Sequence, residues 1–136
     1  MDQQQLETVL LVDDEPQVVT MVKKMLLREG FTVLSASDPE EAVQIAKEHQ
    51  GPIDLLLTDV AMPQLSGRDL ADRLAGMRDG LRVLYMSGFM KETLLKYYSI
   101  SIVGIPFIQK PFTQQTLSSK VREVLSAPAA GAAGGA

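Results

Sequence analysis

Cysteine is absent from the 136-residue sequence, so neither a disulfide framework nor a thiolate metal site can form within it. No apolar run approaches the roughly 20 residues that a membrane-spanning helix needs. No positively charged leader precedes an apolar stretch and a small-residue cleavage site. These absences lead us to expect a cytoplasmic protein with no membrane contact by this domain.

An excess of positive charge is also missing. Lys and Arg total 13 against 17 Asp and Glu, which gives a formal net charge of -4, and the basic residues are scattered along the sequence. A nucleic-acid-binding surface needs its basic side chains gathered into a patch or stripe. We therefore expect no nucleic-acid partner.

Short apolar runs alternate with longer segments whose apolar residues recur at helical spacing. This alternation predicts an α/β fold with a parallel sheet. The predicted strands cover residues 9–12, 31–36, 53–58, 81–86 and 106–109, and helices are predicted to begin near Asp14, Ser37, Ser66 and Thr113. Between Met90 and Gly104 the pattern predicts only a short or irregular helix, with residues 99–103 more extended.

One folded domain is predicted over residues 6–126, a typical single-domain length. Residues 1–5 are polar and are predicted to be disordered. Residues 127–136 form a low-complexity tail of mostly Ala and Gly, which has too little apolar surface to order itself.

Five polar residues fall just past the ends of four predicted strands: Asp13, Asp14, Asp59, Ser87 and Lys110. Open α/β sheets place their chemistry at the carboxyl ends of parallel strands, so we expect these side chains to share one crevice. Three carboxylates suit a small hard cation such as Mg²⁺. The single histidine is distant in sequence from this cluster, so a transition-metal site has little support.

A carboxylate beside such a cation can act as a nucleophile toward phosphorus, because the cation offsets the repulsion between two anions. An ammonium and a hydroxyl can then hold the phosphoryl oxygens. Asp59, Lys110 and Ser87 fit these three roles, and the product would be an acyl phosphate on Asp59. Its added negative charge can bias a two-state surface.

Four motifs resemble those of the receiver domain of two-component response regulators. They are LVDDEP at 11–16, TDVAMPQLSG at 58–67, MSG at 86–88 and QKPF at 109–112. A single fragment of this kind is weak, whereas four in this order at strand ends are highly specific. The resemblance covers about residues 6–126 and implies a three-layer, doubly wound, five-stranded parallel sheet that is flavodoxin-like, with strand order 2-1-3-4-5.

The resemblance also implies the partner and the metal ligands. A phosphohistidine on a histidine kinase or histidine phosphotransfer domain would donate its phosphoryl group to Asp59. Mg²⁺ would be held by Asp13, Asp14 and Asp59, with the backbone carbonyl of Ala61 as the fourth protein ligand.

The remaining implied roles concern the conformational switch. Lys110 would pair with the acidic cluster before phosphorylation and with the phosphoryl group afterwards, and the Lys110–Pro111 peptide bond would be cis. Ser87 would turn its hydroxyl toward the phosphate, and Phe107 would move inward with it. Ser87 and Phe107 replace the threonine and tyrosine that are frequent in the family, which keeps the hydroxyl at 87 and removes one at 107.

The segment around residues 84–113 and the sequence at 120–125 look most like receivers attached to hybrid sensor histidine kinases. A free-standing response regulator or phosphate shuttle is the alternative. The irregular segment at 91–105 leaves open whether the domain forms a homodimer through the face that many receivers use.

Two other classes compete with this interpretation. A phosphatase-like enzyme with an aspartate nucleophile usually has a second aspartate two residues later, where Ala61 stands here. A flavodoxin-like flavin carrier needs a hydroxyl-rich phosphate loop after the first strand, where Asp13 and Asp14 would repel phosphate. We therefore expect a signalling domain that catalyses only its own phosphorylation and dephosphorylation.

Overall fold

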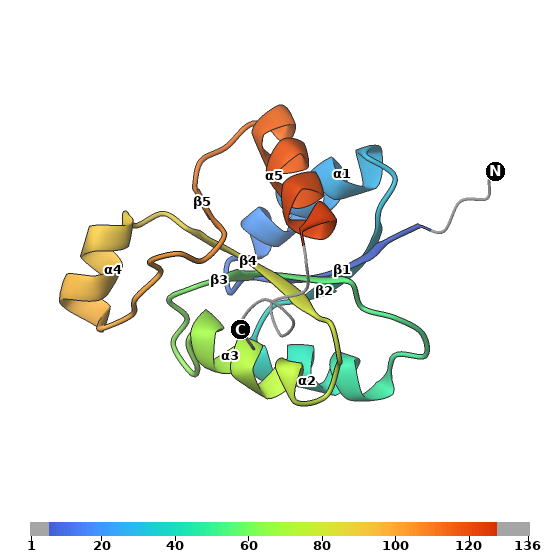
Figure 1. Ribbon diagram of the computed structural model, residues 1–136, viewed down its shortest axis with the longest axis horizontal. Coiled ribbons are helices and arrows are strands. Elements are labelled where there is room, and N and C mark those ends of the chain that lie inside the picture. Colours follow the sequence, from blue (N-terminus) through green and yellow to red (C-terminus); the bar gives the residue numbers. More distant parts are fainter. Residues whose placement is uncertain (1–5, 128–136) are drawn as a thin grey trace.

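The computed structural model describes residues 6–127, which form a five-stranded parallel sheet with helices on both faces (Figure 1). The elements are β1 (Thr8–Val12), α1 (Pro16–Arg28), β2 (Thr32–Ala36), α2 (Pro39–Glu48), β3 (Leu55–Asp59), α3 (Gly67–Ala75), β4 (Arg82–Ser87), α4 (Lys91–Tyr98), β5 (Phe107–Gln109) and α5 (Gln114–Ser126). The strand order β2-β1-β3-β4-β5 confirms the predicted doubly wound fold. The predicted disordered N-terminus and nearly all of the predicted tail lie outside the described residues.

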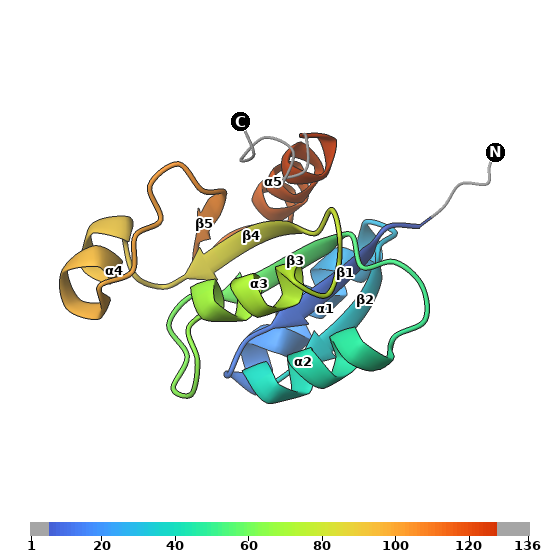
Figure 2. The same cartoon turned by 60° about the horizontal axis from the view of Figure 1, so that its bottom comes forward.

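Helices α1 and α5 cover one face of the sheet, and α2 and α3 cover the other (Figures 1 and 2). Strand β1 shows why its sequence is apolar throughout. Val9 and Leu11 pack in the core beneath α1 and α5, whereas Leu10 and Val12 pack in the core beneath α2 and α3. Alternate residues point to opposite faces, and both faces are covered. Among the described residues, no helix is long and apolar enough to cross a membrane.

Three helices begin at residues whose side-chain oxygen accepts a backbone N–H of the first turn. These N-caps are Asp38 for α2, Ser66 for α3 and Thr113 for α5. Helix α1 differs from the prediction. Asp14, near which the helix was predicted to begin, precedes it together with Glu15. The first residue of α1 is Pro16, whose missing N–H costs nothing at that position.

Two strands extend one residue beyond the predicted ends. Asp59 is the last residue of β3, where it pairs with Met86, and Ser87 is the last residue of β4, where it pairs with Gln109. The backbone pairing therefore continues through both polar residues. Their positions are set by the sheet itself and not by a following loop.

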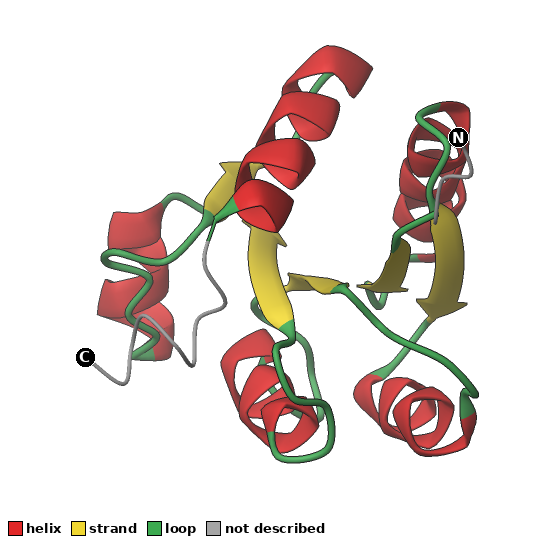
Figure 3. Cartoon of the chain, turned by 45° about the vertical axis from the view of Figure 1, so that its right-hand side comes forward, coloured by secondary structure: helices red, strands yellow, loops and turns green. Residues whose placement is uncertain are grey.

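Helix α4 has eight residues, which confirms the prediction of a short helix. The predicted extended stretch after it is wrong, because no strand forms there. Instead, Ser99 adopts a left-handed conformation with φ of 58°, and its N–H and that of Ile100 donate to carbonyls of the last turn. Leu94 is fully buried and anchors α4, which projects beyond the end of the sheet (Figures 1 and 3).

The start of α3 lies unusually close to the end of β3. The Gly67 N–H donates to the Val60 carbonyl at 2.7 Å. A Cβ atom at position 67 would lie 2.3 Å from the Asp59 carbonyl oxygen, which is well inside van der Waals contact. Only glycine fits at this position because the neighbouring atom is backbone.

We expect Gly67→Ala to lower the free energy of unfolding by about 2 kcal/mol, the cost of forcing backbone atoms apart in a packed region. Urea denaturation measures the change. Gly76→Ala is the matched control, because its Cβ would lie 3.5 Å from the nearest atom in a right-handed helical conformation. Equal effects of the two substitutions would contradict the proposed contact.

Candidate functional site

The carboxyl ends of β1, β3, β4 and β5 bring together all five polar residues that the sequence places there. Oxygen atoms of Asp13, Asp14 and Asp59 lie within 4.8 Å of one another. Asp59, Ser87 and Lys110 line one crevice of about 640 Å³ with Asp14 and Ala61. Asp13 is fully buried beneath the crevice. The predicted juxtaposition of these side chains is therefore present.

Lys110 is the cation at the centre of the cluster. Its Nζ donates to Asp13 Oδ2 at 3.0 Å, and it lies 3.7 Å from Asp59 Oδ1 and 3.8 Å from Glu15 Oε1. Its backbone N–H donates to the Ser87 carbonyl at 2.8 Å, and the Lys110–Pro111 bond is cis, as predicted. Burial alone would lower the pKa of Lys110, but the three carboxylates around it raise that pKa above its ordinary value.

Asp13 is held on both carboxylate oxygens. Oδ1 accepts the Glu15 backbone N–H at 2.9 Å, while Oδ2 accepts from Lys110. These two hydrogen bonds satisfy a carboxylate that has no exposed surface. Asp13 is thus fixed in orientation before any ligand arrives.

Asp59 is the buried acid of the cluster whose pKa is raised. Burial raises its pKa from 3.8 to about 7, and the Lys110 charge opposes this rise while the charges of Asp13 and Asp14 add to it. An additional cation at the three carboxylates would favour the ionised form of Asp59. The ligand set consists of hard oxygen donors, so the residues present fit Mg²⁺.

The side chain of Ser87 closes the crevice on the β4 side. It is 1% exposed, and its Oγ accepts the Phe89 backbone N–H at 3.0 Å. The hydroxyl hydrogen remains available to donate to a group in the crevice. Phe89 stands at the rim, 42% exposed, and its ring packs against that of Tyr98 with centroids 5.2 Å apart.

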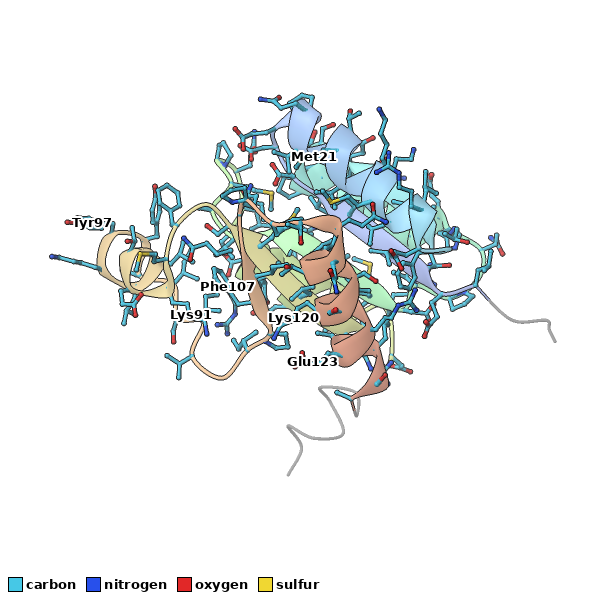
Figure 4. The ribbon with its side chains drawn as sticks, turned by 90° about the horizontal axis from the view of Figure 1, so that it is seen from above. Met21, Lys91, Tyr97, Phe107, Lys120 and Glu123 are labelled. Carbon is cyan, nitrogen blue, oxygen red and sulfur yellow. The ribbon has the colours of Figure 1, made fainter. Side chains whose placement is uncertain are left out.

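Phe107 lies next to the site on the edge strand. Its ring is half-buried and packs against the core beneath α2 and α3. The Lys91 ammonium lies 5.7 Å from the ring centroid. Figure 4 shows Phe107 and Lys91 on the same side of the molecule as Lys120, whereas Tyr97 lies at the outer end of α4.

Several residues at the crevice were missed by sequence reasoning. Glu15 contacts Lys110, while Val18, Met21 and Phe112 form an apolar rim. Figure 4 shows Met21 on α1. Glu15 was within reach of prediction because it follows Asp13 and Asp14 directly. Val18 carries no such signal, because its spacing is that of an ordinary core position, and Met21 is an exposed residue of α1. Phe112 belongs to the QKPF motif, but sequence reasoning assigned it no role at the site.

Comparison with known proteins identifies relatives across most of the chain. The family model for the response regulator receiver domain matches residues 9–122. The chain is 30% identical over 118 residues to sensor kinase CckA of Brucella abortus, covering 87% of this chain and 12% of the kinase. It is 32% identical over 119 residues to the probable transcriptional regulatory protein TcrX of Mycobacterium tuberculosis, covering 87% of this chain and 49% of TcrX.

Solved structures agree with this result. The crystal structure of the receiver domain from the hybrid histidine kinase CckA is 34% identical, with a TM-score of 0.72. The match covers 88% of this chain and 99% of that structure. The chain thus spans almost all of a solved receiver domain but half or less of the curated relatives described above.

The raised pKa of Asp59 generates a prediction about stability. Between pH 3.8 and about 7 the folded state holds a proton that the unfolded state releases, so the stability of the parent falls as pH rises through this window. In EDTA, Asp59→Asn is expected to raise the free energy of unfolding by about 2 kcal/mol near pH 8, and by less near pH 5. Urea denaturation at both pH values measures the gain.

Asp79→Asn is the control, because Asp79 is exposed. It is expected to leave stability within about 0.5 kcal/mol of the parent. An Asp59→Asn gain that is the same at both pH values would show that the buried charge is not the cause.

Proposed function

Because this chain belongs to the response regulator receiver domain family of two-component systems, we propose that Asp59 is its phosphoacceptor and that a phosphohistidine on a histidine kinase or phosphotransfer domain is the donor. The observation that carries this proposal is the buried Asp59 carboxylate, set between two further carboxylates and the Lys110 ammonium. No other arrangement among the described residues gathers three acids this closely.

Mg²⁺ would be held by Asp13, Asp14 and Asp59, together with the backbone carbonyl of Ala61, which lines the same crevice. When bound, the cation offsets the repulsion between the Asp59 carboxylate and the incoming phosphoryl group. Side chains of this domain would supply the other contacts to the phosphoryl group.

In the transfer step, an Asp59 carboxylate oxygen attacks phosphorus while the bond from phosphorus to the histidine nitrogen breaks and the nitrogen keeps that electron pair. The Lys110 ammonium, 3.7 Å from Asp59 before transfer, would pair with a phosphoryl oxygen afterwards. The Ser87 hydroxyl would donate to another. The product is an acyl phosphate on Asp59, and its hydrolysis by water returns the free carboxylate and releases inorganic phosphate.

The switch proposal concerns Ser87 and Phe107. Ser87 would rotate toward the new phosphoryl group, and Phe107 would move inward from its half-buried position. The Lys91 contact to the ring would then be lost, changing the surface at α4 and β5. The added phosphoryl charge of about -1.5 to -2 provides the bias.

We further propose that the chain is the receiver of a hybrid sensor histidine kinase and acts in the cytoplasm. The support is the 34% identity to a solved receiver of that kind and the identity to a sensor kinase. A free-standing response regulator or phosphate shuttle is the second candidate. The 32% identity to TcrX, of which the chain covers 49%, favours a response regulator over a kinase as the parent but not a free-standing one. The coding sequence on both sides of residues 1–136 distinguishes these two parents.

Intact mass spectrometry tests the phosphoacceptor. The parent chain incubated with Mg²⁺ and acetyl phosphate or phosphoramidate is expected to gain one phosphoryl group, and EDTA is expected to abolish the gain. Asp59→Asn should show no gain, because the amide is not a nucleophile toward phosphorus. Asp79→Asn, which removes an exposed carboxylate, should behave as the parent does.

Modification of Asp59→Asn to the parent level would place the phosphoryl group elsewhere and overturn the assignment. Absence of modification in the parent with both donors would show that the domain signals by binding alone.

A further inference from the structure

Two peptide units separate Asp59 from Ala61, and both are held by hydrogen bonds from outside them. In the first unit, the Val60 N–H donates to the Met86 carbonyl of β4 at 3.1 Å. The Thr58 hydroxyl donates to the Asp59 carbonyl at 2.9 Å. The Gly67 N–H donates to the Val60 carbonyl at 2.7 Å. These three contacts together fix the orientation of both peptide planes, and therefore the position of the Ala61 carbonyl relative to the Asp59 carboxylate.

The position of the Asp59 carbonyl explains why it needs the Thr58 hydroxyl as a hydrogen-bond donor. The pairing of β3 with β1 ends at Thr58, which is opposite Val12, so this carbonyl lies past the last residue that β1 pairs. The backbone of Gly67 covers it so closely that a single added carbon atom would lie 2.3 Å from the oxygen. A buried carbonyl without a donor is costly, and the Thr58 hydroxyl supplies the donor.

The Thr58 hydroxyl is a polar group that follows three apolar residues of β3. Residues 55–57 are all leucine, and Thr58 is fully buried like them. Valine has nearly the same shape as threonine and would fill this apolar position without a polar atom. Packing therefore does not account for a hydroxyl here, whereas the bond to the Asp59 carbonyl does.

We propose that Thr58 is a positioning residue for the phosphoacceptor site: its hydroxyl orients the Asp59–Val60 peptide so that the Asp59 carboxylate and the Ala61 carbonyl face the same cation. The inference rests on the proposed function of Asp59 and deepens it. Thr58 itself touches neither the cation nor the phosphoryl group. Thr58 acts on the site only by orienting the Asp59–Val60 peptide, to which its hydroxyl is bonded.

The test uses two matched pairs that differ in the hydroxyl. The first pair is the parent and Thr58→Val, which lacks the hydroxyl but keeps the shape of the side chain. The second pair is Thr58→Ser and Thr58→Ala, which differ in the hydroxyl of a smaller side chain. If Thr58→Val does not fold, the second pair still decides. Amide chemical shifts are followed in a Mg²⁺ titration of each ¹⁵N-labelled chain, which gives a binding constant without any phosphodonor. Phosphorylation rates with acetyl phosphate are measured in parallel.

We expect the chains without the hydroxyl to bind Mg²⁺ about tenfold more weakly than their partners, the scale of losing a group that orients metal ligands. Thr58→Ser should stay within about twofold of the parent, because it keeps the hydroxyl. Phosphorylation of the hydroxyl-free chains should slow by a similar factor at low Mg²⁺ and recover in part at saturating Mg²⁺. A purely structural role would lower stability in urea and leave the Mg²⁺ affinity of the folded chain unchanged.

Equal Mg²⁺ affinities within both pairs would overturn the role of Thr58 while leaving Asp59 as the phosphoacceptor. A parent chain that binds Mg²⁺ but takes up no phosphoryl group would overturn the function proposed for Asp59, and the titration would still decide on Thr58.

Discussion

The crowding of Asp13, Asp14 and Asp59 within 4.8 Å of one another is the constraint on which the site depends. Like charges at this distance repel, and burial strengthens the repulsion. One ammonium, that of Lys110, is shared among the buried Asp13, Asp59 and the more exposed Glu15. Burial, with a smaller contribution from the charges of Asp13 and Asp14, raises the pKa of Asp59. Apolar residues at these strand ends would be more favourable for folding alone, so the uncompensated acids support the cation site proposed above.

The same constraint links the site to the edge of the sheet. Lys110 follows β5, and its backbone N–H is bonded to the Ser87 carbonyl at the end of β4. A change in the partners of its ammonium therefore acts on the two strands that carry the hydroxyl and the half-buried ring of Phe107. Helix α4 is attached beside them mainly through Leu94 and presents much of its remaining surface to solvent. The helix with a single buried residue is thus adjacent to the group whose charge would change under the proposed function.

Sequence reasoning predicted the layers, the strand order and the gathering of the polar residues, because apolar runs and strand ends are local signals. It placed Asp59 and Ser87 one residue outside their strands, since pairing with a neighbouring strand decides where a strand ends. It missed the apolar rim and the extended contacts of Glu15, which arise from tertiary packing. The path after α4 was mispredicted because β-branched residues outweighed the left-handed Ser99 that turns the chain.

The strand order determines when the residues of the site come together as the chain is made. The acidic cluster and its lysine come from positions 13, 59 and 110, on strands that meet only when β1, β3, β4 and β5 are side by side. No fragment ending before β5 contains the complete set. During synthesis, the Asp59 carboxylate is therefore made well before the chain supplies its counter-charge. The site is complete only after the last strand has formed, so a chain that stops before β5 or loses it would lack the proposed phosphoryl-transfer chemistry.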